Sequence, residues 1–160
     1  MSIDADLSHP PEKIPEFINK IKNGFDMVMS SRYIPGGNVD QNIKNYLVSK
    51  LGAHYLSLMF RIPIKDFTTA YRIMRRELWE KINSYKYSKK NMFLIESIYN
   101  AYKHGAKLSD VPIFFKDREF GVSKTPLLKM AIKSLFIPFK MRLAQLRKPN
   151  FKNISNSKRS

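Results

Sequence analysis

Two aspartates separated by a single residue, Asp4 and Asp6, have the spacing in this chain that most directly suggests chemistry. Both carboxylates of such a pair can reach one hard divalent cation, which prefers oxygen ligands and keeps water or phosphate oxygens in its remaining positions. A Mg²⁺ or Mn²⁺ ion held there would connect the carboxylates to the diphosphate of a substrate. A lone Asp-x-Asp is also typical of a polar turn after a strand, so the pair needs support from the rest of the chain.

That support comes from polar motifs that follow the aspartates in order. They are Ser30-Ser31-Arg32-Tyr33 with Gly36-Gly37, Asp66-Phe67-Thr68-Thr69-Ala70-Tyr71-Arg72, and Val111-Pro112-Ile113 leading into Arg118-Glu119-Phe120-Gly121-Val122-Ser123-Lys124. With these motifs the chain resembles the polyprenyl-phosphate glycosyltransferases of glycosyltransferase family two, most closely the dolichyl-phosphate mannosyltransferases. The resemblance runs from about Ile3 to Lys124.

The resemblance implies an α/β fold, namely the C-terminal portion of a GT-A (nucleotide-diphospho-sugar transferase) Rossmann-like sheet with flanking helices. Members of the family carry a nucleotide-binding half before the Asp-x-Asp, and here only Met1, Ser2 and Ile3 precede it. We therefore expect either a truncated product or one half of a split enzyme, whose partner is a separate N-terminal half or a membrane subunit.

For the metal and the donor, the resemblance implies that Asp4 and Asp6 hold the cation and that Ser8 stands at the position of a third metal contact. Arg32 is implied to bind phosphate, since a guanidinium grips phosphate oxygens with two donors. The alternative for Arg32 is an ordinary surface cation. Asp66 is implied to belong to the catalytic group.

A polyprenyl phosphate is already largely ionised near neutral pH, so it needs no base to activate it. Asp66 is therefore expected to orient Arg72 or the donor sugar, and its alternative is a helix or turn cap. Arg72 is expected to contact substrate. Ser49 matches a family serine that contacts the acceptor phosphate, whereas the family arginine on the same helix is replaced by Asn45.

Arg118, Ser123 and Lys124 are implied to bind substrate from a loop that closes over the donor and acceptor phosphates. The alternative is a solvated basic loop. Either Lys44 or Lys50 could supply the charge that is missing at Asn45.

The hydrophobic periodicity predicts helices over residues 12–22, 42–60, 77–82 and 91–104, with strands over residues 26–31 and 107–115. Ile3 is expected to end a buried strand, and the strand at residues 26–31 is expected to be parallel. The apolar residues of the long helix are Ile43, Tyr46, Leu47, Leu51, Tyr55, Leu58 and Met59, all on one side. Trp79 is expected in the core.

The composition calls for an anionic partner, because 29 Lys and Arg face 13 Asp and Glu for a formal net charge of +16. Nucleic acid, a membrane surface and phosphorylated substrates all satisfy that charge. The aromatic residues recur at core-like helical spacing, which disfavours nucleic acid. The chain contains no cysteine, which fits either redox compartment. No signal peptide is visible, so we expect a cytoplasmic protein, peripheral at the cytoplasmic face of a membrane.

We expect a partial GT-A domain over residues 1–125, an amphipathic helix over 126–146 and a basic disordered tail over 147–160. Lys129, Lys133 and Lys140 share one face of that helix, which favours an interfacial helix over a transmembrane span, and ordinary packing within the domain is the alternative.

The sequence as a whole predicts a metal-dependent enzyme that transfers a hexose with inversion. We expect mannose as the sugar, GDP-mannose as the nucleoside-diphosphate donor and a polyprenyl or dolichyl phosphate as the acceptor. The alternative function is that of an inactive truncated fragment, which acts only as a basic module on membrane or nucleic acid.

Overall fold

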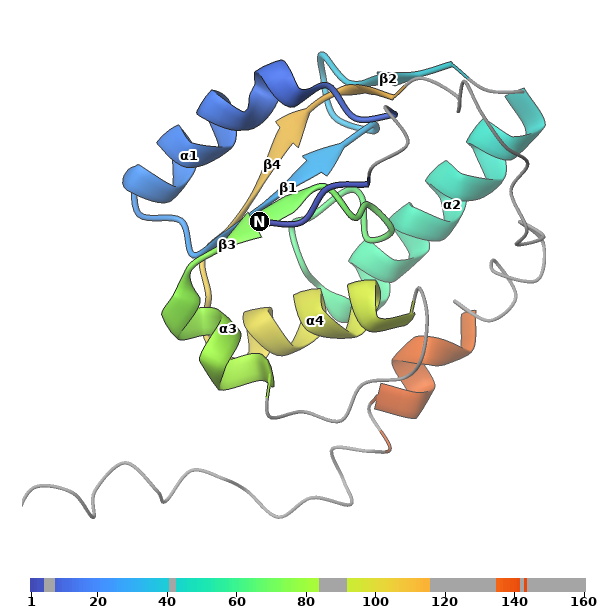
Figure 1. Cartoon of the computed structure of the whole chain (residues 1–160). Helices are drawn as coiled ribbons and strands as arrows, with labels where there is room; N and C mark the ends of the chain where they lie inside the picture. Colours follow the sequence, from blue (N-terminus) through green and yellow to red (C-terminus); the bar gives the residue numbers. More distant parts are fainter. Residues whose placement is uncertain (5–7, 41–42, 84–91, 116–134, 142, 144–160) are drawn as a thin grey trace, which may run out of the picture.

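A mixed sheet of three strands forms the centre of the computed structural model, which describes residues 1–4, 8–40, 43–83, 92–115, 135–141 and 143 (Figure 1). Strand β1 (Met27–Ser31) lies between β3 (Arg72–Met74) and β4 (Leu108–Pro112). It pairs in parallel with β4, as expected, and antiparallel with β3. A second, two-stranded sheet joins β2 (Asn38–Val39) in parallel with β5 (Phe114–Phe115).

The side chains of β1 alternate between two cores, because successive strand residues point to opposite faces of a sheet. Met27 and Met29 belong to the larger core, and Val28 belongs to the smaller one. All three are fully buried. Helices must therefore cover both faces of the sheet, which gives the three-layer α/β arrangement.

Helix α1 (Ile14–Lys22), preceded by the 3₁₀ turn η1 (Pro11–Lys13), covers the face with the smaller core. Its one buried residue, Phe17, stacks on Tyr71 with ring centroids 4.5 Å apart. The chain leaves the helix through Gly24, whose φ of 92° is a left-handed conformation that glycine adopts without strain.

Helices α2 (Ile43–Phe60), α3 (Arg76–Asn83) and α4 (Met92–Lys103) build the larger core on the other face (Figure 1). Buried side chains from α2, α3 and α4 meet Met27 and Met29 there. Gly105, with φ of 77°, follows the end of α4 and confirms the helix end that the sequence predicts.

The face of α2 that packs on the sheet differs from the apolar side expected from the sequence. Ala53, Leu56 and Phe60 are buried, whereas side chains of the expected side remain in solvent. Exposed fractions on that side are 64% for Ile43, 49% for Leu47, 67% for Leu51 and 69% for Leu58. Because α2 is apolar on two sides, periodicity alone could not choose the packed one.

Two smaller expectations are wrong. Trp79 is 38% exposed, because Leu78 and Ile82, one helical turn apart, fill the inner face of α3. Ile3 is also 38% exposed rather than at the end of a buried strand. The adjacent contact is a single antiparallel bridge from Ser2 to Arg72, so one side of Ile3 faces solvent.

Residues 135–141 are helical, as is residue 143, and this segment contacts α2. The hydroxyl of Tyr55 donates to the carbonyl oxygen of Leu135 at 2.9 Å, and Ile137 belongs to the larger core. The expected helix over 126–146 is thus described only in part, and Lys129, Lys133 and the tail over 147–160 lie outside the described residues. Of the helices that the structure describes, none combines the length and apolarity needed to cross a membrane.

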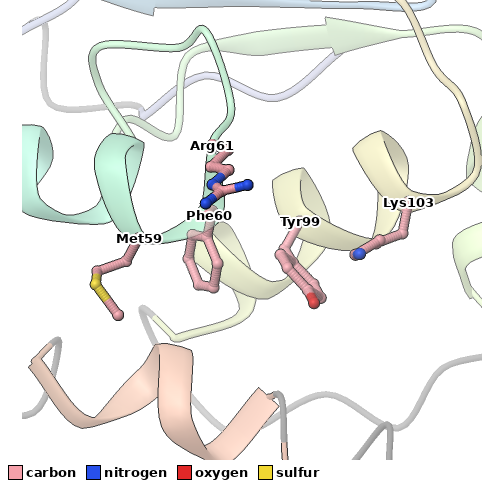
Figure 2. A pocket seen from close by; sticks show the side chains of 5 residues that line it. All are labelled: Met59, Phe60, Arg61, Tyr99 and Lys103. Atoms are coloured by element: carbon pink, nitrogen blue, oxygen red, sulfur yellow. The ribbon is translucent and has the colours of Figure 1, made fainter.

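A cavity opens between the end of α2 and α4, with a volume of about 310 Å³. Figure 2 shows the side chains around it, which are those of Met59, Phe60, Arg61, Tyr99 and Lys103. No site residue predicted from the sequence lines this cavity.

Candidate functional site

Arg32 follows β1 directly and is held by the loop between α2 and β3. Its Nε donates to Asp66 Oδ2 at 2.7 Å, and its Nη2 donates to Asp66 Oδ1 at 3.1 Å and to Thr68 Oγ1 at 2.9 Å. The side chain of Asp66 is fully buried, and that of Arg32 is 13% exposed. Although burial lowers the pKa of Arg32, the charge and hydrogen bond of Asp66 outweigh it, so the pKa is raised. The pair is thus a charged, two-donor contact at the end of a central strand.

Asp66 also organises its own loop. The backbone N–H of Thr68 donates to Asp66 Oδ1 at 3.2 Å, and the Thr68 hydroxyl donates to the same oxygen at 3.1 Å. This is the side-chain turn that aspartate typically forms with a residue two positions on. The geometry matches the turn-cap alternative for Asp66, and the arginine that Asp66 orients is Arg32 rather than Arg72.

Arg72 lies inside the protein, 2% exposed. Its Nη1 donates to Ser97 Oγ at 2.9 Å and to the Leu94 carbonyl oxygen at 3.2 Å, while its Nη2 donates to the carbonyl oxygen of Thr69. Burial lowers the pKa of Arg72 to about 10, and the charge of Asp66 opposes that shift. In the described structure Arg72 therefore joins β3 to α4 instead of facing a ligand.

Aromatic rings enclose the guanidinium of Arg32. Its central carbon lies 5.0 Å from the centroid of the Tyr33 ring and 5.4 Å from that of Phe115. Tyr33 in turn packs on Tyr46 of α2, with ring centroids 5.9 Å apart. Burial raises the pKa of Tyr33 to about 12, and Arg32 and Ser49 oppose the shift. Tyr33 thus contacts Arg32 through its ring and is influenced by the predicted acceptor residue Ser49.

Asp4 approaches this arrangement through His9. Asp4 Oδ2 lies 3.6 Å from His9 Nε2, with the Asp4 side chain 49% exposed and that of His9 only 3% exposed. The His9 ring meets the Phe115 ring edge-on, with centroids 5.4 Å apart. Since Phe115 also contacts Arg32, one aromatic ring connects the start of the chain with the Arg32–Asp66 pair. Residues far apart in the sequence therefore meet at the ends of β1 and β5.

The residues predicted to hold a metal are only partly described. Asp4 offers a half-exposed carboxylate, which fits a hard cation, whereas Ser8 is 2% exposed and Asp6 lies outside the described residues. Within the described ranges, no cluster of three or more His, Asp or Glu side chains could hold a metal ion. Arg118, Ser123 and Lys124 also lie outside those ranges.

Sequence reasoning missed four residues that build this site, namely His9, Tyr33, Thr68 and Phe115. Tyr33 and Thr68 lie within motifs already singled out, so their adjacency to Arg32 and Asp66 was an available signal. His9 was not assigned to any site, and Phe115 was read as a strand residue. Nothing in the spacing indicated that their rings touch.

Residues 1–82 match the family described as Glycosyl transferase family 2. The chain is 37% identical over 126 residues to the polyprenol monophosphomannose synthase of Mycolicibacterium smegmatis, a match that covers 78% of this chain and 48% of that protein. It is 30% identical over 126 residues to the undecaprenyl-phosphate mannosyltransferase of Micrococcus luteus, covering 78% of this chain and 51% of that protein. The match thus spans about half the length of these relatives.

Proposed function

The chain belongs to glycosyl transferase family 2. From that premise we propose that it is the part of a mannosyltransferase that contains the Asp4-x-Asp6 motif, and that the enzyme transfers mannose to a polyprenyl phosphate. The names of the two relatives support mannose as the sugar and a polyprenyl phosphate as the acceptor. We further propose GDP-mannose as the donor. In this proposal the part of the relatives that this chain does not cover supplies the binding of the nucleotide base.

One observation carries the proposal: Phe115 contacts both His9, the neighbour of Asp4, and Arg32, the partner of Asp66. The half-exposed carboxylate of Asp4 and the guanidinium of Arg32, which is paired with Asp66, therefore lie on the same edge of the protein. Transfer between two phosphate-bearing substrates needs both kinds of group, because the donor diphosphate binds through a cation and the acceptor phosphate binds through a positive side chain.

The proposed reaction is a displacement at the anomeric carbon of mannose. An oxygen of the polyprenyl phosphate forms the new bond to that carbon, and the bond to the nucleoside diphosphate breaks on the opposite side, giving inversion. The leaving diphosphate keeps the bonding electron pair. No proton has to move first, because the second pKa of a phosphomonoester is about 6. Arg32 would bind the acceptor phosphate, and Asp66 would keep the guanidinium in place.

Asp4 and Asp6 are proposed to hold a divalent cation, Mg²⁺ or Mn²⁺. When bound, such an ion supplies positive charge beside the diphosphate that leaves. Ser8 is 2% exposed and is proposed as the third metal contact, with its hydroxyl acting through a water molecule. The proposed acceptor contacts beyond Arg32 are Ser49 and the residues outside the described ranges, Arg118, Ser123 and Lys124.

We propose that residues 126–146 lie on a membrane surface, since the acceptor is a lipid and the chain carries a net charge of +16. In the described part of this segment, Phe136 is 64% and Phe139 is 55% exposed. Exposed rings on a basic helix suit the interface between headgroups and acyl chains. The proposed domain division into residues 1–125, 126–146 and 147–160 follows from this role.

The test is transfer of radiolabelled mannose from GDP-mannose into lipid-extractable product, using this chain together with the nucleotide-binding part that the proposal requires. Arg32→Ala is expected to lower transfer roughly hundredfold, as loss of a charge-assisted phosphate contact predicts. Arg76→Ala is the matched control, because Arg76 is an 87% exposed arginine paired with Glu80 on α3. Equal transfer by the two variants would contradict the role of Arg32. Vesicle binding without any transfer would instead favour a purely basic binding module.

A further inference from the structure

The loop that carries Asp66 has little regular structure to hold it. Among the described residues, the backbone hydrogen bond that joins residues 63–67 to another element runs from the N–H of Lys65 to Asp110 Oδ2, at 3.1 Å. The buried side chains of Ile64 and Phe67 anchor the loop in the larger core on either side of this contact. The direction of the backbone at Asp66 therefore depends on a carboxylate from β4.

Asp110 occupies a position where an apolar residue would be expected. It is in register with Met29 of β1, which belongs to the larger core, and Leu108, two residues earlier, packs against that core. Residues two apart on a strand point to the same face. Asp110 Oδ1 is buried with no hydrogen-bond partner among the described residues. An ionised carboxylate in such a place destabilises the fold, so packing does not explain its presence.

From this geometry we propose that Asp110 is a positioning residue: it fixes the backbone at Lys65 so that the neighbouring Asp66 holds Arg32 in the orientation that binds phosphate. The proposal rests on the proposed function of Arg32. The chain of contacts runs from Asp110 to Lys65 through a backbone hydrogen bond, and from Asp66 to Arg32 through the ion pair.

The charge state of Asp110 adds a measurable property to this contact. The pKa of Asp110 is raised to about 7, mainly by burial and in addition by the charge of Asp66, while the Lys65 N–H and the charges of Lys20 and Lys65 oppose the shift. Near neutral pH the carboxylate therefore exchanges between a charged form, which accepts the Lys65 N–H strongly, and a neutral form, which accepts it more weakly. A change of charge at Asp110 should reach Arg32 through the loop.

The test follows the Lys65 amide and the Arg32 Nε–H by nuclear magnetic resonance as the pH is varied. Both signals are expected to shift with a common midpoint near 7. Asp110→Asn should abolish that titration while keeping the contact, because the amide oxygen of asparagine still accepts a hydrogen bond. Asp110→Ala should raise hydrogen exchange at both positions roughly tenfold, as loss of one hydrogen bond predicts.

Asp26→Ala is the matched control, because Asp26 Oδ2 also accepts a backbone N–H, that of Lys107, at 2.8 Å. It should leave the Arg32 signal unchanged. An Arg32 signal that shows no midpoint near 7, or that responds equally to Asp26→Ala and Asp110→Ala, would overturn the proposal. If Asp110→Ala fails to fold, the titration with Asp110→Asn decides alone.

These measurements need no substrate, so they are separate from the test of the proposed function. If the Arg32 signal follows Asp110 but Arg32→Ala leaves transfer intact, positioning stands and the phosphate role fails. If Arg32→Ala abolishes transfer but the Arg32 signal does not respond to changes at Asp110, the phosphate role of Arg32 stands and the positioning role of Asp110 fails.

Discussion

Replacing Asp66 by asparagine tests the central contact of the site. The change leaves the shape of the side chain but removes the charge that faces Arg32, whose own side chain is only 13% exposed. Removing one partner of a buried ion pair typically costs about 3–5 kcal/mol, because the other charge stays buried without compensation. Asparagine keeps one acceptor oxygen, so we expect a loss of about 3 kcal/mol. Against a total stability of about 5–15 kcal/mol, that loss should be evident.

The assay is urea denaturation followed by circular dichroism, with the free energy of unfolding compared between wild type and variant. Glu80→Gln is the control, since it breaks the exposed Arg76–Glu80 pair and should change stability by less than about 1 kcal/mol. Adding Arg32→Met to Asp66→Asn completes a double-mutant cycle. The double variant should be less destabilised than the sum of the two single variants, because it leaves no buried charge.

Two results would refute this reasoning. One is a loss for Asp66→Asn as small as that for Glu80→Gln. The other is strict additivity of Asp66→Asn and Arg32→Met, which would mean that the two side chains do not stabilise each other.

Three further predictions concern the metal, the membrane and pH. Asp4→Asn or Asp6→Asn should abolish metal-dependent transfer while leaving the circular dichroism spectrum intact, and unchanged metal dependence in both would reject the site. Deletion of residues 126–160 should reduce sedimentation with anionic vesicles, and added salt should weaken the remaining vesicle binding. Full vesicle binding by the truncated chain would contradict the membrane role of residues 126–146. Because burial raises the pKa of Asp110 from 3.8 to about 7, the folded chain binds a proton that the unfolded chain has released between those values. The free energy of unfolding should therefore fall as pH rises through this window. In Asp110→Asn the urea midpoint should depend less on pH over the same range.

Much of the fold could be predicted because β1 and the helices carry clear patterns. Residues 26–31 read as a buried strand, and the structure buries every residue of β1. The packed face of α2 could not be predicted, since Leu51 and Leu56 are equally apolar yet lie on opposite sides of the helix. The sheet decides between them through the contacts of Met27 and Met29, which periodicity within one helix does not contain.

The candidate site also has parts that the sequence could predict and parts that only the structure shows. Arg32 and Asp66 were each expected to have a role, but their pairing arises from strand order, because β3 and the loop before it return beside β1. The sequence places Asp110 within the strand predicted over residues 107–115 and assigns it no role. Only the register with Met29 reveals that the carboxylate points toward a core.

The pairing of Arg32 with Asp66 changes how Arg32 can bind phosphate. A guanidinium has five N–H donors, and the bonds to Asp66 and Thr68 use the one on Nε and those on Nη2. In the described structure the two donors on Nη1 are left for a ligand, so the phosphate would meet one nitrogen rather than the two-donor edge that the sequence suggests. Asp66 also neutralises the charge of Arg32 before any ligand arrives. If Arg32 binds the acceptor phosphate as proposed, affinity for it depends on additional cations. Lys44 and Lys50 of α2, on the same helix as Ser49, are the described residues best placed in sequence to provide them.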